Sequence, residues 1–80
     1  MNEIKFPAFR KYIGVETYFR IESNEIFEEI RRIGEKFTIE IHHAKILPDR
    51  NFIHDLLYDF RNFAEEITPE EYEKARKMAF

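Results

Sequence analysis

Three histidines are the side chains of this 80-residue sequence best suited to hold a metal ion. His42 and His43 are adjacent, and neighbouring side chains of a strand point to opposite faces, so only one of them can enter a given site. Imidazole and carboxylate groups are zinc ligands. We therefore consider a metal site of His43 (or His42), His54 and Asp55 or Asp59. The competing interpretation is ordinary surface, because the spacing matches no defined metal motif.

A second candidate site lies on an alternating segment near the start of the sequence. Arg10, Tyr12, Tyr18 and Arg20 have even numbers, so one uninterrupted register would place them on one strand face. Aromatic rings flanked by arginines can stack bases, which would make this face a single-stranded nucleic-acid surface. Two glutamates on the same face and a net charge of −3 argue against nucleic acid. We interpret Tyr12, Tyr18 and Arg20 instead as a protein-binding face.

The parts of well-known catalytic schemes are missing from the sequence. It has no cysteine, one serine and two glycines twenty residues apart. These counts exclude a thiol nucleophile, a disulfide scaffold, a cysteine-ligated metal and a glycine-rich phosphate loop. The acidic pairs Glu28–Glu29 and Glu65–Glu66 are interpreted as solvated surface, because acid–base catalysis needs a cleft and a perturbed pKa. We expect no enzymatic activity and no cofactor.

The elements that position these residues begin with a strand signal over residues 9–21, where apolar side chains occupy mainly odd positions. One strand of this length would span about 40 Å, so we expect a break near Gly14. A bulge or a three-residue turn over residues 14–16 keeps the odd positions buried on both sides of the break, whereas a two-residue turn does not.

The segment that follows changes its period. Ser23 or Asn24 can cap a helix, Gly34 fits the residue after its end, and apolar residues follow helical spacing at Ile26, Phe27, Ile30 and Ile33. A strand would place adjacent charges on both of its faces. We therefore expect a helix over residues 24–33.

Three further elements follow in the sequence. Residues 36–43 alternate and predict a strand. A long helix opens at Asp49 as N-cap, and its apolar stripe extends to Ala64. The last helix starts at Thr68, where Glu71 three residues later completes a capping box.

The order strand–strand–helix–strand–helix–helix predicts a small two-layer α+β domain with a three-stranded sheet packed against helices. Residues 1–80 form one domain, in which residues 1–8 are an irregular N-terminal arm. The direction of the strand pairing is left open, and a crossover through residues 24–33 would be right-handed if its strands are parallel neighbours.

The phrases YFRIES, EIFEEIRRIGEKF and AKILPDRNFIHDLLYD resemble small uncharacterised proteins of Bacteroides-type bacteria. The resemblance runs from about Tyr12 to Tyr72. It implies no activity and no site residues.

The high aromatic content favours a binding function. Thirteen Phe and Tyr residues are many for a three-stranded sheet to bury, and edge strands invite pairing between copies. We expect a cytoplasmic protein that binds another protein, or itself as a homodimer. Nucleic acid is an unfavoured partner, and no stretch is long enough to span a membrane.

Overall fold

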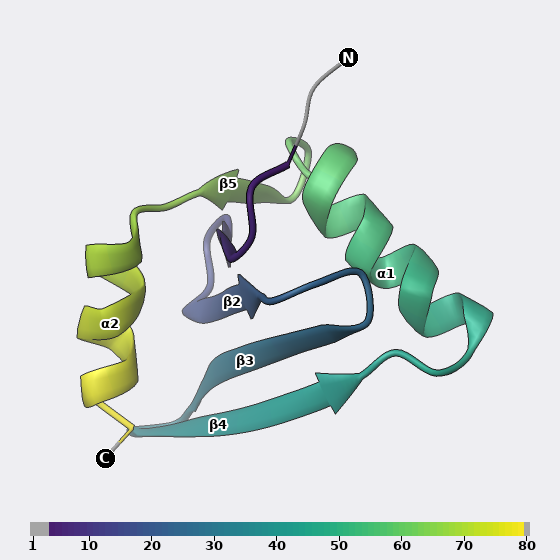
Figure 1. Ribbon diagram of the computed structural model, residues 1–80. Coiled ribbons are helices and arrows are strands. Elements are labelled where there is room, and N and C mark those ends of the chain that lie inside the picture. Colours follow the sequence, from purple (N-terminus) through teal and green to yellow (C-terminus); the bar gives the residue numbers. More distant parts are fainter. Residues whose placement is uncertain (1–3, 80) are drawn as a thin grey trace.

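The computed structural model describes residues 4–79, which form a five-stranded antiparallel sheet and two helices (Figure 1). The strand order across the sheet is β4-β3-β2-β1-β5. The elements along the chain are β1 (Ala8–Tyr12), β2 (Thr17–Ile21), β3 (Ile26–Ile33), β4 (Lys36–His43), α1 (Leu47–Tyr58), β5 (Ala64–Glu66) and α2 (Pro69–Lys77).

The two helices cover opposite faces of the sheet. The α1 face is a core that includes Phe19, Ile21 and Phe27 of the sheet and Ile53, Leu56 and Leu57 of the helix. The α2 face buries Ile30 against Tyr72 and Ala75, with Phe9 and Tyr18 packed beside them. The domain therefore has three layers, helix, sheet and helix, and the expected two-layer arrangement is wrong.

The expected three-stranded sheet is wrong for two reasons. Residues 24–33 do not form a helix but contribute the interior strand β3, and residues 64–66, expected at the end of a helix, form the edge strand β5. In a strand, Phe27 and Ile30 point to opposite faces, and each meets a different helix layer. The adjacent charges that favoured a helix are accommodated separately: Glu28 meets Tyr72 on the α2 face, and Glu29 meets His42 on the α1 face. The direction of the strand pairing, which the sequence left open, is antiparallel between all neighbouring strands of the sheet, so residues 24–33 do not form a crossover.

The break in the first strand signal is a hairpin loop of four residues, 13–16, rather than three. Pairing of Lys11 with Tyr18 and of Arg10 with Phe19 switches the parity across the loop, so even positions of β1 share a face with odd positions of β2. Ile13 and Val15, expected inside, are 56% and 53% exposed. Gly14 supplies a positive φ of 84° within the loop.

The strand expected at residues 36–43 is confirmed as β4. It pairs with β3 through a two-residue turn, Gly34-Glu35, which follows from the pairing of Ile33 with Lys36. Gly34 has a φ of 64°, so its role is to start a type II′ hairpin turn rather than to end a helix.

The long helix is shorter than its apolar stripe and starts earlier than expected. α1 has Ile46 at the N-cap position, with no side-chain cap, and Asp49 lies in the first turn. The helix ends at Tyr58. A tight turn follows, in which the carbonyl oxygen of Phe60 accepts hydrogen bonds from the backbone N–H groups of Phe63 and Ala64. Residues 64–66 then join β1 as edge strand β5.

The last helix begins as expected. Thr68 is the N-cap of α2, and its hydroxyl oxygen accepts a hydrogen bond from the Glu71 backbone N–H at 3.1 Å. β1 begins at Ala8, the last residue of the expected arm; residues 4–7 precede it, and residues 1–3 lie outside the described part. Neither helix of residues 4–79 is long and apolar enough to cross a membrane.

Candidate functional site

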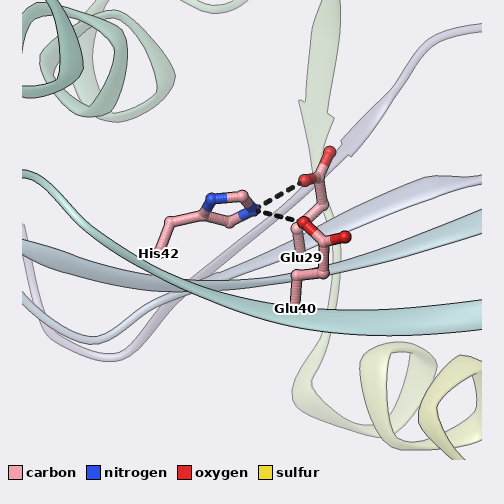
Figure 2. A group of neighbouring side chains, drawn as sticks. All are labelled: Glu29, Glu40 and His42. Carbon is pink, nitrogen blue, oxygen red and sulfur yellow. Dashed lines mark hydrogen bonds and ion pairs between the residues drawn. The ribbon is translucent and has the colours of Figure 1, made fainter.

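Two strands bring a histidine and two glutamates together on the α1 face of the sheet. Glu29 of β3 lies directly opposite Glu40 of β4, and His42 follows two residues later on the same face of β4 (Figure 2). Their ligand atoms, one from each residue, all lie within 4.8 Å of one another. Within the described residues this is the one such group of three histidine or acidic side chains.

The imidazole of His42 is the centre of the group. Its Nε2 lies 2.9 Å from Glu29 Oε1 and 3.5 Å from Glu40 Oε2. The ring stacks on Phe27 with a centroid separation of 4.8 Å and an interplanar angle of 18°. Because Phe27 belongs to the buried core, this contact fixes the orientation of the imidazole.

The two glutamates differ in burial. The Glu29 side chain is 17% exposed and that of Glu40 is 56% exposed. Burial, together with the charge of Glu29, raises the pKa of the Tyr12 phenol above its usual value, so Tyr12 is a neutral neighbour of the group. Like charges directly opposite each other on a sheet destabilise it, and His42 balances them only in its protonated form.

The metal site expected from the sequence is not assembled. His43 pairs with Ile26 and therefore faces away from the Glu29 side of the sheet. His54 and Asp55 lie on the exposed surface of α1, where the His54 ring contacts Tyr58 at 4.8 Å. In residues 4–79, His43, His54 and Asp55 form no group with converging ligand atoms. Of the two adjacent histidines that the sequence offered for this site, His42 is the one that lies beside two carboxylates.

The binding face expected from the sequence is divided between the two sides of the sheet. Tyr12 lies on the α1 face, where its ring packs 4.9 Å from that of Phe19. Tyr18 and Arg20 lie on the α2 face, and Tyr18 is half-buried beneath that helix. Arg20 Nε is 2.6 Å from Glu22 Oε1 but lacks the geometry of a hydrogen bond. A binding role for these three residues stays a prediction, without the shared face on which it was based.

Arg10 has a structural role that its sequence position concealed. Its residue surface is only 5% exposed, and Nε donates to the carbonyl oxygen of Leu56 at 2.9 Å. Nη2 reaches the carbonyl oxygen of Leu57 at 3.5 Å, and the guanidinium lies 4.3 Å from the centre of the Phe60 ring. Arg10 thus binds the carboxyl end of α1, where backbone carbonyls lack helical partners. Burial lowers its pKa, but an arginine remains charged.

The α2 face carries a second glutamate, which has fixed partners. The Tyr72 hydroxyl donates to Glu28 Oε1 at 2.6 Å, and Arg76 Nε lies 3.4 Å from the same oxygen. Burial and then the bond to Glu28 raise the pKa of Tyr72 strongly. Glu28 and Glu29 are therefore neighbours in the sequence with unequal surroundings.

The outer edge of β4 is a further candidate. β4 has eight residues and ends the sheet, so no described segment pairs with its outer side (Figure 1). Its apolar α2-facing side chains are Phe37, Ile39 and Ile41, of which Ile41 is 62% exposed. The opposite edge strand, β5, has only three residues.

Comparisons with family models, with curated proteins and with solved structures found no match to this chain. A proposal about function therefore rests on the small α+β fold and its side-chain geometry. The resemblance to small Bacteroides-type proteins stays a prediction.

Proposed function

We propose that the chain is a protein-binding module that pairs with a second copy of itself through the outer edge of β4. The observation that supports this proposal is an eight-residue edge strand whose apolar side chains continue to the last row of the sheet. Exposed edge strands of this kind are templates for pairing with another chain.

The sequence of β4 favours one antiparallel register. A two-fold axis perpendicular to the sheet at Ile39 places Ile39 opposite its own copy and Phe37 opposite Ile41, so the apolar row continues across the interface. On the other face, Glu40 lies opposite Thr38. Moving the axis by one residue places Glu40 opposite Glu40, which like-charge repulsion disfavours.

Cysteine cross-linking tests this register directly, because the chain contains no cysteine of its own. Under mild oxidation, an Ile39→Cys variant should form a disulfide-linked dimer, since opposite Cβ atoms lie about 4.5–5.5 Å apart in an antiparallel pair. Ile41→Cys is the matched control on the same face. It is the more exposed position, so random collision would cross-link it faster, whereas the proposed register separates the two copies of residue 41 by four positions.

The oligomeric state gives a second, independent measurement. Sedimentation of the wild type should show a dimer at tens of micromolar, and Ile41→Lys should be monomeric because it adds a charge to the interface. Ile33→Lys is the control, since Ile33 is 56% exposed but lies at the hairpin end of β3. A wild-type monomer at several hundred micromolar, or equal effects of the two substitutions, would refute the proposal. The cytoplasmic location stays a prediction.

A further inference from the structure

We propose that Glu29, Glu40 and His42 bind one divalent transition-metal ion, with zinc preferred. Two of these residues belong to β4, but all three side chains lie on the α1 face, opposite the apolar row proposed for pairing (Figure 2). One imidazole and two carboxylates supply three ligands and leave a fourth position open to water. The imidazole favours zinc over magnesium or calcium, which prefer ligand sets made of oxygen alone.

The distances between ligand atoms fit such an ion. Zinc lies about 2.0–2.2 Å from nitrogen and carboxylate oxygen, so two ligands of a tetrahedral site are separated by about 3.4 Å. The observed separations from His42 Nε2 are 2.9 Å to Glu29 and 3.5 Å to Glu40. Small rotations of the side chains are enough to admit the ion, and the backbone register does not have to change.

The ligands are also held in place before an ion arrives. His42 is stacked on Phe27 of the core, and the side chain of Glu29, on the interior strand β3, is 17% exposed. Glu40 is the most accessible ligand and comes from the edge strand. The site therefore has two restrained ligands and one that can close over the ion.

The charge of Glu29, Glu40 and His42 also favours the binding of a cation. Two carboxylates face each other across adjacent strands, and the third member is an imidazole. Arg31 lies two residues from Glu29 on the same face, but it forms no ion pair with Glu29 or Glu40. A divalent cation would neutralise the opposed carboxylates, which a neutral imidazole does not.

The competing explanation is a simple ion-pair network around a protonated His42. Titration of ZnCl₂ into the metal-free protein, followed by calorimetry and by the thermal midpoint, distinguishes the two. We expect one zinc ion per chain, a midpoint that rises with zinc, and little or no response to magnesium. His42→Gln and Glu40→Gln should weaken zinc binding at least tenfold, by analogy with the loss caused by changing supporting residues of metal sites.

His43→Gln is the matched control, because it removes an adjacent imidazole that faces the other way. It should bind zinc as the wild type does. Glu40→Gln decides the question if His42→Gln fails to fold, since the Glu40 side chain is 56% exposed and contributes little to the core. Repeating the titration in the Ile41→Lys background shows whether binding is independent of pairing through β4.

Absence of stoichiometric zinc binding by the wild type would overturn the proposal. Equal zinc affinity of Glu40→Gln and wild type, or equal losses in His42→Gln and His43→Gln, would overturn it as well. A preference for magnesium over zinc would refute the assigned metal.

Discussion

The carboxyl end of α1 depends on one buried arginine, which makes Arg10→Met a sharp test of how the sheet holds the helix. The substitution removes the 2.9 Å bond to the Leu56 carbonyl, the 3.5 Å contact with that of Leu57 and the cation above Phe60. Methionine keeps most of the apolar stem, so the change isolates the guanidinium group.

The size of the effect follows from these contacts. A hydrogen bond to a charged group contributes about 1.5–3 kcal/mol, and a desolvated cation–π contact contributes about 1–2 kcal/mol. The cost of burying the guanidinium offsets part of this sum. We therefore expect Arg10→Met to lower the free energy of unfolding by about 2–4 kcal/mol, out of about 4–12 kcal/mol for a chain of this length.

Urea denaturation measures this loss, and the slope of the transition should stay unchanged because the same surface is exposed on unfolding. Arg10→Lys should lose about half as much, since lysine keeps the charge but not the planar fork. Arg61→Gln is the control: its guanidinium lies 5.1 Å from the same Phe60 ring, but its side chain is 82% exposed. A loss below about 1 kcal/mol for Arg10→Met, or an equal loss for Arg61→Gln, would contradict this account.

Three further predictions concern the α2 face and the β3–β4 turn. Tyr72→Phe removes the hydroxyl bonded to Glu28 and should lower the free energy of unfolding in urea by about 1.5–3 kcal/mol. Tyr58→Phe, at a 53% exposed position, is the control and should lower it hardly at all. Equal losses in the two variants would contradict a specific bond to Glu28. Because the pKa of Tyr72 is raised in the folded state, its stabilising contribution is fully present below about pH 10 and is lost progressively above it, where the phenol of the unfolded chain ionises. Unfolding measured from about pH 9 to 11.5 should therefore show a shallower fall in the free energy of unfolding for Tyr72→Phe than for the wild type. Gly34→Ala should lower the free energy of unfolding by about 1 kcal/mol through its positive φ alone, because no atom lies within 4 Å of the added Cβ. The control Glu35→Ala should leave the free energy of unfolding unchanged. An unchanged stability of Gly34→Ala would exclude the type II′ turn.

Local signals were sufficient where an element is defined by its own residues. The strand at residues 36–43 and the Thr68 cap of α2 were both predicted correctly. Alternation of side chains specifies a half-buried strand, and a hydroxyl at the N-cap specifies the start of a helix, without knowledge of distant partners.

The prediction failed where burial depends on both faces of the sheet. In β3, a spacing of three residues between Phe27 and Ile30 imitates a helix, but it places one side chain under each helix layer. The length of the first hairpin loop had a similar effect, because four residues switch the buried parity and three do not. The sequence also did not reveal where α1 ends, because its last turn is bound by Arg10, which lies 46 residues before Leu56 in the chain.

The residues that the sequence analysis grouped into a metal site lie apart for a related reason. Glu40 and His42 are two residues apart on a strand that was predicted correctly, so their shared face was visible in the sequence. Glu29 could not be placed beside them while residues 24–33 were interpreted as a helix. Alternation along the strand separated His42 from His43, but it did not say which of the two faces carries the other ligands.

The two glutamates of β3 form an internal comparison that sharpens the interpretation of the site. Both are largely buried, with side chains 13% and 17% exposed, and both lie on the same interior strand. Glu28 meets a hydroxyl donor and a guanidinium, so its charge is satisfied by the chain itself. Glu29 meets an imidazole and a second carboxylate, so its surroundings add negative charge where those of Glu28 add positive charge. The two carboxylates lie back to back on the sheet, and this difference in surroundings is why the proposed cation is assigned to the α1 face rather than to the α2 face.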